Sequence, residues 1–197
     1  MRTALHSLLL ARGATLGRDL GWDLAMTVPG ESPAAAVVLA DESPVGKFQV
    51  EGKAVPAPAV PAGHRYQVTP NRVLWVVPFE QRAAAWTSLV AACAAGGCAH
   101  PLEMSSCYAS LLLAGPQAAA VLQKVSRLDL RTVAVGGMAA TALTGSPVIL
   151  GRRATGWRIL VGRDEAEDAW EQLERAGEEF GLTVAGWAVA KGWLWRT

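Results

Sequence analysis

The chain has 197 residues, of which 51% are apolar, so it is long enough to bury a core and too hydrophobic to be disordered. Its formal net charge of +1 and its scattered basic residues give no electrostatic support for binding nucleic acid or an acidic membrane. The three cysteines do not form a disulfide framework, and no apolar run approaches the roughly 20 residues of a membrane-spanning helix, so we expect a soluble, cytoplasmic protein.

The first forty residues are predicted to contain two short helices with extended chain between them. Thr3–Ala11 is amphipathic and begins with a residue that caps helices well. Residues 14–28 contain two glycines and favour extended chain or a loop over a long helix. Ser32–Ala40 begins with a serine cap and a proline at the first helical position, which predicts a second helix.

Strand signals dominate the next segment. Gly46–Glu51 alternates apolar and polar residues, which predicts a half-buried antiparallel strand with Lys47 on the polar face. Val55–Gly63 contains three prolines and is interpreted as an extended connector. His64–Val68 and Arg72–Pro78 are then predicted to form a hairpin. A long helix, Glu80–Ala95, follows it and stops at a pair of glycines.

The second half is predicted to alternate strands and helices in the same way. In chain order the expected elements are strand Ala109–Leu113, helix Gln117–Val125, strands Ala139–Thr144 and Pro147–Leu150, strand Trp157–Val161, helix Arg163–Gly181 and a terminal strand Leu182–Ala190. The helix in this group with the clearest pattern carries acidic residues in its first turn and apolar residues on one face.

One segment in each half has the pattern of the same strand–turn–helix unit. Residues 73–90 and residues 157–174 each contain an apolar strand, a turn and a helix with a tryptophan. The equivalent positions are Pro78 and Gly162 at the turn, and Trp86 and Trp170 in the helix. This internal repeat predicts an α+β fold of two similar lobes with antiparallel sheets, within a single domain. The expected lobes span residues 1–100 and 101–197.

Local clusters of polar residues give little evidence for a catalytic or metal site. Cys93 and Cys98 with the nearby His100 match no common zinc spacing, and their ligand set is incomplete, so no metal is expected. The densest basic cluster contains Arg152, Arg153, Arg158 and Arg163. It could bind one anionic group, although a solvated strand-and-turn surface is the favoured interpretation.

The C-terminus carries two tryptophans on one face of the expected terminal strand. Trp193 and Trp195 are separated by one residue, which is the spacing of side chains on the same side of a strand. If they are exposed, the pair would anchor an interface; if they are buried, it would close the sheet.

Four short motifs occur in an order typical of one family. They are Leu5-His6-Ser7-Leu8 with Gly21-Trp22-Asp23, then Ser43–Gly52, then Leu112–Pro116, and finally Trp157–Gly162 leading into Trp170-Glu171. In this order the chain resembles the aminomethyltransferase superfamily, which comprises the T protein of the glycine cleavage system, its tetrahydrofolate-binding relatives and the gamma subunit of heterotetrameric sarcosine oxidase. The gamma branch is the most similar, because residues 114–130 resemble its Gly-Pro helix unit and full transferases add a C-terminal barrel.

The resemblance also shows where the chain departs from the folate-using members. Val55–Gly63 stands where those members supply a pterin-binding Asp, and it contains no acidic residue. Gly151–Gly156 stands in place of a loop that supplies a pterin-binding Glu, and Pro44 replaces a family His. The positions that remain for a cofactor are Trp75, Val77, Lys191 and Arg153. They imply a tetrahydrofolate site that is weak or vestigial.

The resemblance implies a non-catalytic subunit of a heteromeric flavin-dependent amine oxidase or a related one-carbon enzyme. The flavin would lie only on partner subunits, and a larger flavoprotein subunit would be the partner. Whether the chain catalyses a reaction alone stays open, and a subunit of an oxidoreductase complex is favoured. The alternatives are an autonomous tetrahydrofolate-dependent aminomethyl or methyl transferase, and a small-molecule binding protein that uses the cleft between the lobes.

Overall fold

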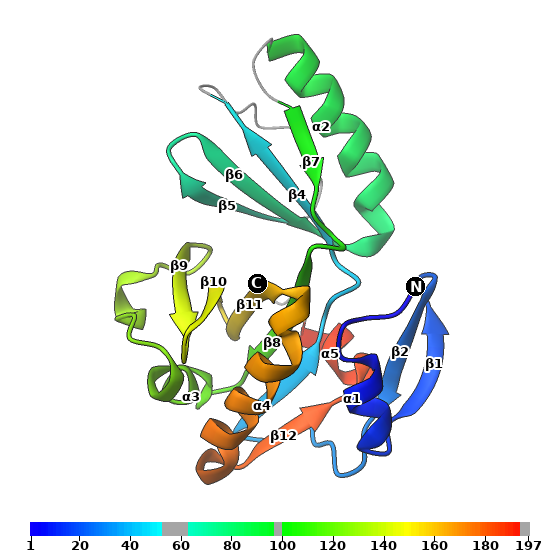
Figure 1. Ribbon diagram of the computed structural model, residues 1–197, viewed down its shortest axis with the longest axis vertical. Helices are drawn as coiled ribbons and strands as arrows, with labels where there is room; N and C mark the ends of the chain where they lie inside the picture. The colour runs from blue at the N-terminus through cyan, green and yellow to red at the C-terminus, as the bar shows by residue number, and fades with distance from the viewer. Residues whose placement is uncertain (53–62, 97–99, 194–197) are drawn as a thin grey trace.

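The structure, a computed structural model, describes residues 1–52, 63–96 and 100–193 and consists of two main sheets with helices on their outer faces (Figure 1). The larger sheet has six strands in the order β12-β3-β8-β11-β10-β9. Its strands are β3 (Val37–Asp41), β8 (Tyr108–Ala114), β9 (Met138–Leu143), β10 (Ser146–Arg153), β11 (Gly156–Gly162) and β12 (Leu182–Ala185). Only the pair formed by β12 and β3 is parallel.

The smaller sheet has four antiparallel strands in the order β5-β6-β4-β7. They are β4 (Gly46–Glu51), β5 (His64–Thr69), β6 (Arg72–Val77) and β7 (His100–Glu103). A 3₁₀ turn, η1 (Phe79–Gln81), leads from β6 into helix α2 (Arg82–Gly96). One face of the sheet packs on this helix through a core that includes Val73, Trp75 and Val77.

Helices and turns of the second half cover the outer face of the six-stranded sheet. They are α3 (Ala118–Val125), η2 (Leu130–Thr132), η3 (Arg163–Glu165), α4 (Ala166–Gly177) and η4 (Glu178–Phe180). The N-terminal helix α1 (His6–Ala11) joins the same layer, because Leu5 and Leu9 belong to one core cluster with Trp170 of α4.

The inner faces of the two sheets meet in a second core cluster. Tyr66 and Leu74 of the small sheet share this cluster with Leu112 and Leu160 of the large sheet. The same cluster includes residues of a two-stranded hairpin, β1 (Thr15–Asp19) and β2 (Trp22–Thr27), and of the C-terminal helix α5 (Trp187–Trp193). The sheets therefore form one packed body with a helical layer on each outer side.

The internal repeat is confirmed at the level of individual backbone angles. The residue before the 3₁₀ turn has φ −52° and ψ 143° at Pro78, and φ −50° and ψ 140° at Gly162. The strand pairing also corresponds, because Val77 lies opposite Gly46 as Val161 lies opposite Ala109. Strands β5-β6-β4-β7 thus match β10-β11-β8-β3. The boundaries of the two lobes stay a prediction, and β3 of the first hundred residues pairs within the sheet of the second half.

The predicted helix over Ser32–Ala40 is wrong, because Val37–Asp41 forms strand β3. All five residues of this strand are buried, with β8 on one side and β12 on the other. Tertiary pairing on both edges outweighs the local helix signals, and two adjacent β-branched valines fit a central strand well. The segment 14–28, expected as extended chain or loop, contains the β1–β2 hairpin.

The predicted terminal strand Leu182–Ala190 is correct only as far as Ala185, after which the chain forms α5. The chain bends at Gly186, where an added Cβ would lie 2.3 Å from the backbone oxygen of Met26. Trp193 therefore lies in a helix, which overturns the strand arrangement expected for it, and Trp195 lies outside the described residues. The short strand β7 was not predicted.

The remaining predicted elements are confirmed within a few residues at their ends. The connector Val55–Gly63 lies outside the described residues except for its last glycine. In the parts of the chain that the structure describes, no helix has both the length and the hydropathy needed to cross a bilayer.

Candidate functional site

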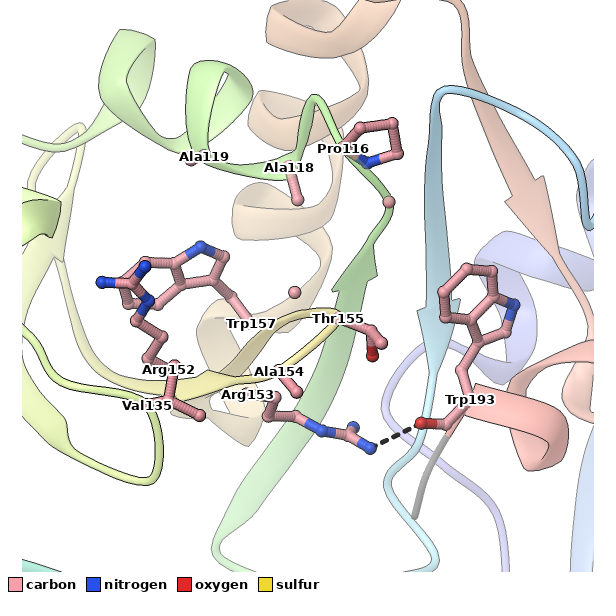
Figure 2. Close-up of a pocket in the computed structure, with 12 residues that line it drawn as sticks. Pro116, Ala118, Ala119, Val135, Arg152, Arg153, Ala154, Thr155, Trp157 and Trp193 are labelled. Atoms are coloured by element: carbon pink, nitrogen blue, oxygen red, sulfur yellow. Dashed lines mark hydrogen bonds between the residues drawn. The ribbon is translucent and has the colours of Figure 1, made fainter. Parts of the chain in front are cut away.

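A pocket of about 390 Å³ lies where the turn after β8 approaches the hairpin of β10 and β11 (Figure 2). The turn contributes the Gly-Pro pair of the family motif, and the hairpin contributes two arginines and a tryptophan. The lining residues are Gly115, Pro116, Ala118, Ala119, Val135, Arg152, Arg153, Ala154, Thr155, Gly156, Trp157 and Trp193. The pocket therefore combines aromatic surface with positive charge.

Two glycines allow the pocket walls to come this close together. Gly115 has φ +110°, and a Cβ there would lie 2.5 Å from the backbone oxygen of Ala36. Gly156 has φ +154°, and a Cβ there would lie 2.3 Å from the backbone oxygen of Leu113. Both positions require glycine, because a side chain would be strained and would collide with neighbouring backbone. The glycine of the Gly-Pro motif therefore allows the turn after β8 to pass in contact with the backbone of Ala36.

The two arginines of the pocket are held by different partners. Arg152 lies over the ring of Trp157, with its guanidinium carbon 5.8 Å from the ring centroid, and its Nη1 donates to the backbone oxygen of Val133 at 2.8 Å. Arg153 donates from Nη2 to the backbone oxygen of Trp193 at 2.6 Å, as Figure 2 shows. Arg152 is the more available cation for an anionic ligand.

Arg153 also belongs to a buried ionic network centred on Glu42. The carboxylate of Glu42 accepts hydrogen bonds from Arg158, from Arg153 Nη1 at 3.3 Å and from Ser110 Oγ at 2.8 Å. Burial opposes ionisation of Glu42, but the charges of the two arginines outweigh this effect and lower its pKa. The carboxylate is therefore ionised, and the network is an internal ion cluster at the junction of the two sheets.

This network corrects the expectation of a solvated surface for two of the four clustered arginines, Arg153 and Arg158, whereas Arg163 is exposed as expected. The side chains of Arg153 and Arg158 are 1% and 0% exposed, and Glu42 supplies the countercharge that allows both to be buried. Glu42 was missed because its partners are distant in sequence, with Arg158 116 positions away. The sequence contains no local signal that joins these residues.

Lys47 is a second buried charge that the strand pattern placed on the exposed face. It is fully buried, and its Nζ donates to the backbone oxygen of Ser43 at 2.9 Å and of Val45 at 3.2 Å. Burial lowers the pKa of Lys47 to about 7, although the negative charge of Glu42 acts in the opposite direction. Lys47 lies on the polar face of β4 but is covered by loop residues of both halves, Ser43 and Ser105 among them. The alternation of polar and apolar residues does not predict this burial.

The histidine nearest this network has a strongly shifted pKa. His64 stacks on Tyr66 with 5.8 Å between ring centroids. Burial lowers the pKa of His64 to about 4, and the positive charges of Arg158 and Arg153 add to this effect. His64 is therefore neutral at physiological pH.

The structure does not bring all four predicted cofactor residues together. Trp75 and Val77 are 7% and 0% exposed in the core beneath α2, and neither lines the pocket of Figure 2. Lys191 pairs with Asp19 at 2.5 Å on the surface of α5. Arg153 lines the pocket and reaches the end of α5 through Trp193. Contact of these residues with a folate stays a prediction.

The candidate metal cluster falls partly outside the described residues. Cys93 is buried, and Cys98 lies in the segment that the structure does not describe. Among the described residues there is no group of three His, Cys, Asp or Glu side chains arranged to hold a metal ion.

The pocket of Figure 2 is chemically suited to binding and not to acid–base or nucleophilic chemistry. Its described lining contains no carboxylate, histidine or thiol, and Thr155 is its one hydroxyl. Trp157 and Trp193 offer aromatic surface, and Arg152 offers a positive charge. This combination fits an anionic or aromatic group held without covalent chemistry.

Comparison with known proteins agrees with the motif order. Residues 64–191 match the family described as GCVT N-terminal domain. An aminomethyltransferase from Halothermothrix orenii is 31% identical over 83 residues, which cover 40% of this chain and 23% of that protein.

Two solved structures have a similar fold. Glycine cleavage system aminomethyltransferase T from Bartonella henselae has a TM-score of 0.76 at 19% identity, covering 96% of this chain and 60% of that chain. Heterotetrameric sarcosine oxidase from Corynebacterium sp. U-96, in complex with pyrrole 2-carboxylate, has a TM-score of 0.67 at 22% identity, covering 93% of this chain and 97% of that chain. The match thus spans less than two thirds of each aminomethyltransferase.

Proposed function

Because this chain belongs to the GCVT N-terminal domain family, we propose that it is a non-catalytic subunit similar to the gamma subunit of heterotetrameric sarcosine oxidase. It would complete a heteromeric flavin-dependent amine oxidase or a related one-carbon enzyme. In this proposal the flavin and the working folate site belong to a larger flavoprotein partner, and any tetrahydrofolate site in this chain is weak or vestigial.

The observation that carries the proposal is the state of the buried carboxylates. Among the described residues, the buried carboxylates are those of Asp41 and Glu42. Glu42 is neutralised by two arginines, and Asp41 accepts a hydrogen bond from the backbone N–H of Ser43 at 2.9 Å. A pterin is best oriented by a carboxylate that accepts two parallel hydrogen bonds. Because both buried carboxylates have internal partners and no carboxylate among the described residues lines the pocket of Figure 2, a catalytic folate site at that pocket is disfavoured.

The comparisons support the same choice among family members. The chain covers 97% of the matched sarcosine oxidase chain but 60% of the matched aminomethyltransferase T. The similarity in fold to a chain of a heterotetrameric sarcosine oxidase supports a role as a subunit.

The test is titration of tetrahydrofolate into the isolated chain, followed by reconstitution with a co-expressed larger flavoprotein subunit. We expect calorimetry to detect no binding stronger than a Kd of about 1 mM, which corresponds to about −4 kcal/mol. We expect size-exclusion chromatography with light scattering to show a stable complex with the flavoprotein subunit. Micromolar tetrahydrofolate binding by the chain alone would overturn the proposal.

The match to the Halothermothrix orenii aminomethyltransferase favours one alternative, an autonomous tetrahydrofolate-dependent transferase. In that case the isolated chain binds tetrahydrofolate tightly, and Trp75→Ala abolishes binding. Val135→Ala is a suitable control, because Val135 is 61% exposed and lies away from Trp75 in the pocket of Figure 2. Equal loss with both variants would indicate general destabilisation.

A further inference from the structure

A second pocket, of about 610 Å³, lies at the start of α2 on the small sheet, apart from the pocket of Figure 2. Aromatic rings of Phe48, Phe79 and Trp86 line it, and the carboxylates of Glu80 and Glu103 lie at it. Phe48 and Trp86 pack against each other with 5.6 Å between ring centroids. It is therefore an apolar pocket with two acidic groups and one basic group, Arg82, and the proposed function does not use it.

The internal repeat shows which segment occupies the equivalent position in the second unit. Trp86 corresponds to Trp170, which is fully buried in the second unit. The core cluster around Trp170 includes Leu5 and Leu9, which belong to α1 and its N-terminal flank. An ion pair between Arg12, the residue after α1, and Glu174 also joins this segment to α4. In the second unit, a short leucine-bearing helix thus covers the position that corresponds to the open pocket.

The strand neighbours of the two sites correspond as well. Glu103 lies opposite Phe48 in the small sheet, as Asp41 lies opposite Leu111 in the large sheet. Burial raises the pKa of Asp41, and the nearby side chain of Thr3, just before α1, opposes this effect. The carboxylate of the second site therefore lies near the segment that covers it, whereas Glu103 is paired with Arg82 of its own pocket.

Two residues near the open pocket, Val90 and Glu80, favour binding of another segment. Val90, one turn after Trp86 on the same side of α2, is 41% exposed, whereas its counterpart in α4 is the charged Glu174. Glu80 makes no ion pair within the described residues, although it is exposed beside the aromatic rings. An incoming segment with apolar side chains and one basic residue would complement both features.

We propose that this pocket docks a short amphipathic helix of the partner chain, with two leucine-like side chains one turn apart and a basic side chain near Glu80. The inference rests on the proposed function for the identity of the partner, and on the internal repeat for the form of the docking segment. Trp86 and Phe79 receive the apolar side chains. The docked helix covers Trp86 as α1 covers Trp170.

The first experiment uses a probe taken from this chain. An acetylated peptide of residues 3–12, which contains the α1 leucines, is titrated into the isotope-labelled chain while the indole N–H resonance of Trp86 is followed. We expect saturable shifts with a Kd on the order of 0.1 to 1 mM, as suits a short helix without other contacts. Ala83→Arg places a basic side chain in the pocket lining, three residues after Glu80, where it pairs with that carboxylate and repels the basic side chain of the docked helix, so binding is expected to weaken by about fivefold.

Ala84→Arg is the matched control, because Ala84 is also exposed in the first turn of α2 but does not line the pocket. Both substitutions place a basic residue in the same turn of α2, so any effect of the helix dipole on stability is shared by the two variants. Binding to the wild type and to Ala84→Arg, with weaker binding to Ala83→Arg, supports the proposal. Absence of any shift in the wild type, or equal affinity in the two variants, overturns it.

The second experiment measures assembly of the same variants with the larger flavoprotein subunit. We expect Ala83→Arg to weaken assembly by about fivefold relative to Ala84→Arg. Equal assembly of the two variants would overturn the assignment of this pocket to the partner. If the peptide binds but the wild type assembles with no flavoprotein subunit, the proposed function fails while the pocket stands as a helix-binding site.

Discussion

The two strand–turn–helix units have the same backbone but different surroundings. The unit of β6 and α2 and the unit of β11 and α4 enter their 3₁₀ turns with nearly equal angles, and each carries a tryptophan at the same helical position. Trp170 is fully buried beside α1, whereas Trp86 lines an open pocket. The repeat therefore fixes the local geometry, and the neighbouring segments decide which surface is buried and which is left for a partner.

The largest expected effect is on the free energy of unfolding when each of the two tryptophans is replaced by alanine. Trp170→Ala should lower the free energy of unfolding by about 4 kcal/mol, because it opens a cavity in a fully packed core. Trp86→Ala should cost about 1 kcal/mol in the isolated chain, since its ring is only partly covered. Urea unfolding of both variants measures the difference. Equal losses would contradict the contrast drawn between the two units.

The second prediction concerns a residue that differs between the inner faces of the two units. Arg158 of β11 occupies the position that Leu74 holds in β6, and its charge is balanced by Glu42. Glu42→Gln should lower the free energy of unfolding by about 3 kcal/mol, because two buried arginines then lack a countercharge. Ser110→Ala, which removes one hydrogen bond to the same carboxylate, should cost about 1 kcal/mol. Similar losses in the two variants would argue against a charge effect.

The smallest effect concerns pH at the same junction. His64 of β5 lies near Arg158, Arg153 and Glu42, and its folded pKa of about 4 is below the ordinary value of 6.5. Protonation therefore favours the unfolded chain, and stability present above pH 6.5 is lost as the pH falls toward 4. We expect a loss of about 1 kcal/mol at pH 4 relative to His64→Gln, with solvent screening of the partly exposed ring included.

Thermal unfolding of the wild type and His64→Gln between pH 7 and 4 measures this effect. The substitution removes the titrating group while keeping a polar side chain, so the difference between the two curves isolates His64. A parallel pH dependence in both proteins would show that this histidine does not titrate as described. A chemical-shift titration of the His64 ring with a midpoint near 4 is the direct check.

Local sequence signals predicted the repeated elements well. The hairpin of β5 and β6, the turn at Pro78 and the long helix after it follow from alternation, prolines and apolar spacing within a few residues. Strand β3 and helix α5 were predicted wrongly because neighbours distant in sequence decide their form.

The candidate site shows the same limit for side chains. The Gly-Pro turn at Gly115 was identified from a motif, because its geometry is set locally. The burial of Lys47 and of Glu42 could not be predicted, since their partners come from other elements: Lys47 lies on a strand with polar residues on alternate positions, and Glu42 follows the end of β3. Charged residues in a single sequence indicate a surface unless their countercharge is known.

Strand β3 also has a consequence for the order in which the chain can fold during synthesis. Val38 pairs with Ala114 on one edge and with Thr183 on the other, so both neighbours leave the ribosome after it. Until then, the apolar strand β3 has two unpaired edges, and this makes the incomplete chain prone to aggregation. The central sheet is therefore completed only when β12 has been made, and slow translation before that point should increase the chain's need for chaperones.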